Sequence, residues 1–275
     1  MTAAFGERLA AAAGELGQLC VGIDPHPGLL EQWGLSDDRD GLAEFTGRCV
    51  EAFAGRVALV KPQVAFFERH GALGFSVLEE AIGELRERGT LVVADAKRGD
   101  IGSTMAGYAD AWLRPGSPLQ CDALTVSPYL GVGALAPAVD AAVEAGAGLF
   151  VLAATSNPEA GAIQRQPGAN AETLAGDVVA EVAKLAAING DRGEGLSDFG
   201  VVVGATLSDP PGLADFPGPI LLPGIGAQGA SLSDIERVVA GNTARAFPNV
   251  SRAVLSAGPD IEALAERVSQ FSYRG

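Results

Sequence analysis

The chain has 275 residues, of which 48% are apolar, enough to bury the core of one large domain. Its formal charge of −15 at pH 7, with only 19 Lys and Arg residues, disfavours a nucleic-acid partner, since a negative surface repels phosphate polymers. No run approaches the roughly 18 apolar residues of a membrane helix, and segment 1–14 lacks the basic start of a signal peptide. We therefore expect a cytoplasmic protein that binds neither nucleic acid nor membrane.

Eight short apolar runs alternate with longer segments of helical periodicity. Most of the runs are near-continuous Val, Leu, Ile and Ala, as is typical of parallel strands that helices cover. We expect strands at 19–24, 58–62, 91–97, 123–127, 148–155, 200–206, 220–224 and 249–252. We expect helices at 41–56, 72–88, 132–145, 171–187 and 231–240, with Gly89, Gly146 and Gly190 at helix ends.

This alternation predicts the fold class. Eight strand–helix repeats in a chain of this length are typical of a closed (β/α)8 barrel, so we predict an α/β fold in which residues 1–275 form one barrel domain. An open doubly wound sheet is the alternative, but the number of repeats favours closure. The alanine-rich segment 1–14 predicts an extra N-terminal helix at the bottom of the barrel, and 161–170 and 190–197 are expected to be surface loops.

The segment 91–104, LVVADAKRGDIGST, carries the densest group of charges. Alternate side chains of a strand share one face, so Asp95 and Lys97 should continue the inward apolar face of the third strand. They would then lie at the C-terminal mouth of the barrel, where barrel enzymes have their active sites. Asp100 follows after one short turn, whereas Arg98 has the opposite parity and is expected on the surface or at an interface. A solvated loop with a salt bridge is the alternative interpretation.

Other expected strands also end in polar residues. The first run ends at Asp24 and the second at Lys61, and the C-terminal ends of parallel strands meet at the same mouth. We therefore expect both side chains to converge with the charges of the third strand. The fourth run ends at Ser127, for which a site residue and a simple turn or cap are equally open.

The segment 221–229, LLPGIGAQG, follows the seventh strand and precedes a predicted helix. Glycines let backbone N–H groups approach an anion closely, and barrels commonly bind phosphate in the loops after strands seven and eight. Arg252, at the end of the eighth run, could pair with a phosphate through two hydrogen bonds. The segment therefore predicts a phosphate site, although glycines alone could serve ordinary turns.

The cysteines and histidines do not have the spacing of a metal site. Cys20, Cys49 and Cys121 are scattered and odd in number, which disfavours a disulfide framework. His26 and His70 lie far apart, and neither belongs to a ligand motif. We expect no metal site.

These motifs together resemble the orotidine 5'-monophosphate decarboxylase family, in particular its bacterial type 2 subgroup. The family's D-x-K-x-x-D-I-x-x-T motif matches Asp95, Lys97, Asp100, Ile101 and Thr104. Further similar segments are VGIDPHP, VKPQVAFFE, DALTVSPYLG, ATSNPEAG and PGIGAQG, so that the resemblance spans about 20–252. Related hexulose-phosphate synthases and ketogulonate-phosphate decarboxylases share the D-x-K-x-x-D core, but they bind magnesium through an additional glutamate. Here Lys61 stands where that glutamate would be expected.

The resemblance implies decarboxylation of orotidine 5'-monophosphate to uridine 5'-monophosphate without metal or cofactor. Lys97 would protonate carbon 6 of the pyrimidine, Asp95 would lie against the departing carboxylate, and Lys61 would hold the charged array. Asp100 and Thr104 would come from the neighbouring subunit of a homodimer. A fixed ammonium group is suited to this chemistry, because it stabilises the electron pair left on the ring carbon and can then deliver the proton.

The resemblance also implies how the substrate binds. Asp24 would bind a ribose hydroxyl, Ser127 the pyrimidine ring, and Gln228, Arg252 and backbone N–H groups near Gly226 the phosphate. Two other functions remain open: a magnesium-dependent sugar-phosphate aldolase on the same barrel, and a noncatalytic barrel that binds phosphate ligands.

Overall fold

The computed structural model of this chain describes residues 3–188 and 195–275. Its eight parallel strands close into a barrel in the order β1 to β8, and the predicted (β/α)8 barrel is confirmed. The alternative of an open sheet is wrong, because β1 pairs with β8 as well as with β2. The strands are β1 Cys20–Ile23, β2 Leu59–Pro62, β3 Leu91–Arg98, β4 Ala123–Val126, β5 Gly148–Ala154, β6 Phe199–Val203, β7 Ile220–Pro223 and β8 Ala246–Val250.

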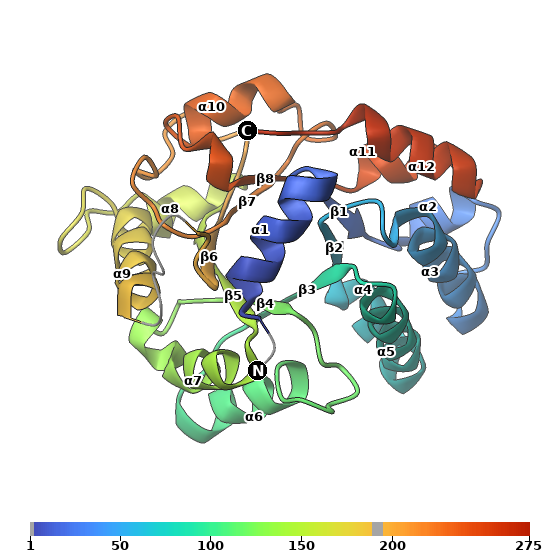
Figure 1. Cartoon of the computed structure of the whole chain (residues 1–275), viewed down its shortest axis with the longest axis horizontal. Helices are drawn as coiled ribbons and strands as arrows, with labels where there is room; N and C mark the ends of the chain where they lie inside the picture. The colour runs from blue at the N-terminus through green and yellow to red at the C-terminus, as the bar shows by residue number, and fades with distance from the viewer. Residues whose placement is uncertain (1–2, 189–194) are drawn as a thin grey trace.

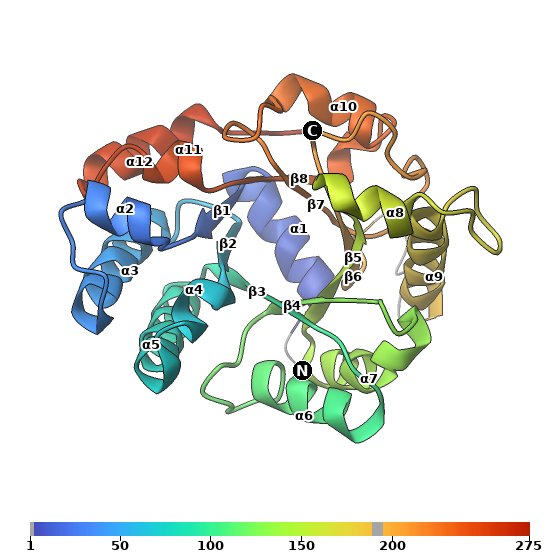
Figure 2. The same cartoon turned by 180° about the vertical axis from the view of Figure 1, so that it is seen from behind.

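Helices surround this barrel, and one helix lies across its end (Figures 1 and 2). The α-helices are α1 Phe5–Leu16, α2 Pro27–Gln32, α3 Arg39–Phe53, α4 Val64–Glu68, α5 Gly71–Glu87, α6 Gly102–Trp112, α7 Ala136–Ala145, α8 Gly161–Gln164, α9 Leu174–Ile188, α10 Ile235–Val238, α11 Arg252–Leu255 and α12 Ile261–Gln270. Short 3-10 turns are η1 Val132–Leu135, η2 Pro158–Ala160, η3 Leu232–Asp234 and η4 Thr243–Arg245. Within the described residues, none of the helices is both long and apolar enough to cross a membrane.

Alternation along β3 divides its side chains between two apolar layers. Leu91 and Val93 belong to the cluster inside the barrel, whereas Val92 and Ala94 pack in the layer between the strands and the helices. The same interior cluster takes side chains from the other strands, among them Cys20, Leu59, Ala123, Phe150, Val202, Leu221 and Phe247. The inward parity predicted for β3 is therefore confirmed, and the charges that follow Val93 come to the mouth.

The N-terminal helix α1 closes the bottom of the barrel, as the sequence predicted. Its Phe5 ring packs edge-on against Phe150, with 6.0 Å between ring centroids. Gly148 makes room for it, because a Cβ at that position would collide with the Phe5 ring. Arg8 in the same helix pairs with the carboxylate of Asp122, just before β4. The opposite end of the barrel is left for the functional site.

Some predicted boundaries are wrong. The eighth strand begins at Ala246 rather than 249, and Arg252 begins helix α11 instead of ending the strand. The expected helix 231–240 is two shorter pieces, η3 and α10. Helices α2, α4, α6, α11 and α12 were not predicted, and the loop 161–170 contains α8. The expected helix end at Gly190 and much of the loop 190–197 lie outside the described residues.

Candidate active site

A cavity of about 250 Å³ opens at the C-terminal ends of the strands. Side chains from both halves of the barrel line it, so residues far apart in the sequence meet here. Its polar lining consists of Asp24, Lys61, Gln63, Asp95, Lys97, Thr125, Thr155, Gln228, Asn249, Ser251 and Arg252.

The carboxylate of Asp95 lies between two lysines at the base of this cavity. Lys61 Nζ donates to Asp95 Oδ2 at 2.7 Å, and Lys97 Nζ donates to Asp95 Oδ1 at 2.6 Å. The side chains of Asp95 and Lys61 are 10% and 8% exposed, whereas that of Lys97 is 44% exposed. One ammonium is thus buried behind the carboxylate, and the other is available to a molecule in the cavity.

Burial and neighbouring charges shift the pKa values of Asp95 and Lys61 in opposite directions. Burial alone raises the pKa of the Asp95 carboxyl, but the charges and hydrogen bonds of Lys61 and Lys97 outweigh it and hold that pKa well below the usual range. Burial alone lowers the pKa of Lys61, but the carboxylates of Asp95 and Asp24 outweigh burial and hold that pKa above the usual range. Asp95 and Lys61 are therefore both charged at neutral pH.

Two further residues contact Asp95, and the sequence reasoning missed both. Gln63 Nε2 donates to Asp95 Oδ2 at 2.8 Å, and its Oε1 accepts from Lys97 Nζ at 3.4 Å. Thr125 Oγ1 donates to Asp95 Oδ1 at 3.0 Å. Sequence features could have indicated both residues. Gln63 directly follows β2, and Thr125 shares the parity of the inward Ala123 on β4.

Asp24 lies just beyond β1, on the wall of the cavity. Its Oδ1 atom is buried and has no hydrogen-bond partner among the residues that the structure describes. A buried carboxylate oxygen without a donor is costly. A hydroxyl group of a bound molecule could supply that donor.

Two of the expected phosphate residues, Gln228 and Arg252, line the cavity on the rim formed after β7 and β8. Gln228 Oε1 accepts from Ser156 Oγ at 3.1 Å, which links the β7 loop to the β5 loop. Arg252 lines the cavity, is exposed, and makes no ion pair within residues 3–188 and 195–275. Gly226 differs from the expectation, because its N–H donates to the Ala230 carbonyl at 2.7 Å and the residue does not line the cavity.

Three expected site residues lie away from this cavity. Asp100 Oδ1 accepts from its neighbour Ile101 N–H at 2.8 Å, and Thr104 is exposed on the first turns of α6. Ser127 lines a separate cavity, and its N–H donates to the Arg98 carbonyl at 2.7 Å. Within one chain, the structure therefore brings none of Asp100, Thr104 and Ser127 to the two lysines.

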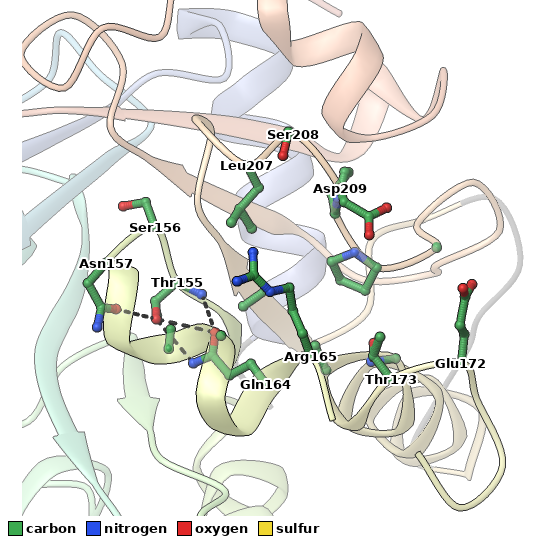
Figure 3. A pocket seen from close by; sticks show the side chains of 18 of the residues that line it. Thr155, Ser156, Asn157, Gln164, Arg165, Glu172, Thr173, Leu207, Ser208 and Asp209 are labelled. Carbon is green, nitrogen blue, oxygen red and sulfur yellow. Dashed lines mark hydrogen bonds between the residues drawn. The ribbon is translucent and has the colours of Figure 1, made fainter. Parts of the chain in front are cut away.

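A second cavity, of about 220 Å³, shares Thr155 with the first; Figure 3 shows the side chains that line it. Thr155 is fixed within the β5 loop: its N–H donates to Gln164 Oε1 at 2.8 Å, and its Oγ1 donates to Asn157 Oδ1 at 2.7 Å. Arg165 also lines this second cavity. Thr155 is a further lining residue of the charged cavity that the sequence did not indicate.

Neither a metal cluster nor a reactive thiol is found among the described parts of the chain. No group of three or more His, Cys, Asp and Glu residues there could hold a metal ion. Cys20 is buried inside the barrel, and this burial raises the pKa of its thiol to about 12. The thiol is therefore protonated at neutral pH and is a poor nucleophile.

Comparison with known proteins relates this chain to one family of decarboxylases. The model of the "Orotidine 5'-phosphate decarboxylase / HUMPS family" matches residues 17–267. An orotidine 5'-phosphate decarboxylase of Corynebacterium efficiens is 59% identical over 98% of this chain and 96% of its own length. That of Streptomyces coelicolor is 54% identical, over 98% and 95%. A crystal structure from Streptomyces avermitilis, assigned as an orotidine 5'-phosphate decarboxylase, matches with a TM-score of 0.93 and 52% identity over 98% of this chain and 94% of that one.

The buried carboxylate predicts a pH-dependent stability. In the folded protein the pKa of Asp95 lies below its unfolded value of roughly 3.9. Its ionised form therefore stabilises the fold above that pH, and this stabilisation is lost as the pH falls through the folded value. Asp95→Asn should lower the free energy of unfolding by about 3–5 kcal/mol at neutral pH, since it removes the hydrogen-bonded counter-charge of the buried Lys61.

Urea unfolding of both proteins across the acid range measures the difference. The deficit of Asp95→Asn should be largest at neutral pH and should shrink as the pH falls below about 4. Asp140→Asn, on the exposed surface of α7, serves as the control and should change stability by no more than about 0.5 kcal/mol. A deficit of Asp95→Asn that stays constant down to about pH 2 would contradict the charged state assigned to Asp95.

Proposed function

This chain belongs to the orotidine 5'-phosphate decarboxylase / HUMPS family, and from that premise we propose that Lys97 is the proton donor of its reaction. The reaction is the decarboxylation of orotidine 5'-monophosphate to uridine 5'-monophosphate in pyrimidine biosynthesis. The observation that carries the proposal is the Lys97 ammonium, held 2.6 Å from the buried Asp95 and partly exposed to the cavity. We further propose that the whole chain acts as one barrel domain.

The chemistry needs a cation and a proton at one ring carbon. The bond between carbon 6 and the carboxylate carbon breaks, carbon dioxide leaves, and the electron pair stays on carbon 6. The Lys97 ammonium stabilises this charge as it develops, and it then transfers a proton from Nζ to carbon 6. Lys97 regains its proton from water, so the enzyme is ready for the next turnover.

Asp95 and Lys61 position the proton donor. Asp95 holds Lys97 Nζ through a charge-assisted hydrogen bond, and Lys61 compensates the Asp95 charge from the buried side. In this arrangement Asp95 lies against the departing carboxylate. Leu152, Val202 and Leu221 line the same cavity and offer an apolar surface to the neutral carbon dioxide that forms.

The remaining lining residues are suited to the rest of the substrate. The unpartnered Oδ1 of Asp24 accepts a hydrogen bond from a ribose hydroxyl. Arg252 and Gln228 bind the phosphate on the rim, where Arg252 supplies the positive charge. The Gly226 N–H, occupied within its own loop, is not part of this proposal. Ser127, for which the family resemblance implied contact with the pyrimidine ring, lines a separate cavity of this chain and is not part of this proposal.

The reaction is proposed to need neither metal nor cofactor. Lys61 Nζ already lies 2.7 Å from Asp95 Oδ2, on the side where a magnesium ion bound by Asp95 would meet a like charge. This contact favours the decarboxylase over a magnesium-dependent aldolase on the same barrel.

A homodimer in the cytoplasm is proposed as the working form. Asp100 and Thr104 lie outside the cavity of their own chain, in the exposed segment that follows β3. Apolar side chains lie exposed near the ends of the paired strands β3 and β4: Ile101 is 62%, Tyr129 79% and Leu130 54% exposed. Contiguous exposed apolar surface is typical of a protein interface, and we propose that these side chains belong to such a surface. Asp100 and Thr104 would complete the site of the neighbouring subunit.

Lys97→Ala tests the central role of this lysine. The variant should fold, because the side chain is partly exposed, and its kcat should fall at least a hundredfold, since general acid catalysis contributes roughly 10²–10⁴-fold. Turnover is followed by the loss of ultraviolet absorbance of orotidine 5'-monophosphate, and folding by urea denaturation.

The control is Lys184→Ala, which removes an exposed lysine of α9 and should keep wild-type activity. A Lys97→Ala enzyme with more than about a hundredth of the wild-type kcat would show that Lys97 is not the proton donor. Wild-type activity should persist in chelator. Loss of activity that magnesium restores would instead support the metal-dependent alternative.

Subunit exchange tests the shared site. Two inactive variants, Lys97→Ala and Asp100→Asn, are mixed and allowed to exchange subunits. A mixed dimer then has one site with both lesions and one with neither. With random pairing half of the dimers are mixed, so activity should recover to roughly a quarter of the wild-type value.

Each variant alone, carried through the same exchange, is the control and should remain inactive. If Asp100 serves its own subunit, every site in the mixture keeps one lesion. Mixing would then restore no activity, and the cross-subunit role of Asp100 would be wrong while the decarboxylase function stood.

A further inference from the structure

The backbone of Lys97 is strained. Its φ is 50°, and in the described part of the chain the only other non-glycine residue with a positive φ is Ala240. A lysine in the left-handed region persists only where its surroundings hold it there. The strain falls in β3, between Ala94 and Arg98, where the register with β4 shifts. Simple strand alternation therefore does not by itself place the Lys97 ammonium.

One hydroxyl group on β4 contacts this strained point. Thr125 Oγ1 accepts from the Lys97 N–H at 2.9 Å and donates to Asp95 Oδ1 at 3.0 Å. The direction of both bonds follows from the groups: a backbone N–H can only donate, and an ionised carboxylate can only accept. Thr125 is 1% exposed, so water cannot easily replace its hydroxyl.

The next residues of the turn are also held by β4. The Arg98 carbonyl accepts from the Ser127 N–H at 2.7 Å. Gly99 allows this close approach, because a Cβ there would collide with the Ser127 carbonyl oxygen. These contacts fix the turn after Lys97, while Thr125 fixes Lys97 itself.

We propose that Thr125 is a positioning residue that sets the place of the Lys97 ammonium by bonding both its backbone and its counter-ion. The hydroxyl ties the strained Lys97 N–H to the same Asp95 oxygen that the Lys97 Nζ contacts. Backbone, ammonium and carboxylate therefore form one closed set of hydrogen bonds. Without the hydroxyl, the Lys97 N–H has no acceptor in its strained conformation and the backbone can relax toward the ordinary strand region.

Thr125→Val tests this inference, because valine keeps the shape and removes the hydroxyl. Since Thr125 acts through Lys97, the inference depends on the proton transfer proposed above. The kcat of Thr125→Val should fall by roughly 10- to 100-fold, in line with losing hydrogen bonds to a charged group. Its KM should stay within about threefold, because the phosphate rim is untouched. Thr125→Ser, which restores the hydroxyl, should keep at least about a third of the wild-type kcat.

Thr46→Val is the matched control. Thr46 is also a buried threonine, 2% exposed on α3, and its Oγ1 has no partner in the described residues. This variant should retain wild-type kcat and KM, and urea unfolding should show all three variants folded. If valine prevents folding, Thr125→Ala removes the hydroxyl without crowding and provides the same comparison with serine.

The outcomes separate the inference from the function on which it depends. A Thr125→Val kcat within about twofold of wild type, or an equal loss in Thr125→Ser, would overturn the positioning role. Lys97→Ala is measured in parallel. If it were inactive while Thr125→Val was unaffected, only the role of Thr125 would fail; an active Lys97→Ala would instead overturn the proposed proton donor.

Discussion

The ion pairs that Asp95 makes with Lys61 and Lys97 are the interaction on which the site depends. A buried carboxylate is unfavourable unless it is paired, and here each oxygen bonds a lysine as well as a neutral donor, Gln63 or Thr125. Because Lys61 is buried behind Asp95, that carboxylate can hold a second ammonium toward the cavity. The exposed Lys97 is thus oriented by Asp95 and available to a bound molecule.

The two ends of the barrel have different roles. The bottom is packed and stabilises the fold, whereas the mouth carries the polar site. At the bottom, α1 packs Phe5 into the interior against Phe150, and Arg8 pairs with Asp122. Apolar side chains then fill the interior up to Val93, one alternate position before the first charge, Asp95. A well-packed base supports polar groups at the mouth whose own placement is costly, including the left-handed backbone of Lys97.

The parts of the fold that depend on local pattern could be predicted from the sequence. The eight apolar runs predicted the barrel, and alternation placed Asp95 on the inward face. The eighth strand was located late because Pro248 interrupts its apolar pattern, although this proline pairs with Leu222 of β7. Helix α12 was missed despite a detectable signal, Asp260 as N-cap before the apolar Ile261, Leu264 and Val268.

The contacts within the site were less predictable, because they depend on register between distant segments. Thr125 lies inward by parity, but its hydrogen bonds to Lys97 and Asp95 depend on a register shift between β3 and β4. No local sequence pattern predicts this shift. The bond from the Gly226 N–H to Ala230 likewise depends on how the β7 loop closes on itself. Asp100 and Thr104 are a different case, since their proposed partners belong to another subunit.

The central claim is that Lys97 transfers a proton to carbon 6, and proton exchange measures that step without decarboxylation. Uridine 5'-monophosphate is incubated with the enzyme in D2O, and loss of the carbon 6 proton signal is followed by proton NMR. The wild-type enzyme should catalyse the exchange, and Lys97→Ala should reduce it to the rate without enzyme. Exchange by Lys97→Ala at the wild-type rate would contradict the assignment of Lys97 as the proton donor.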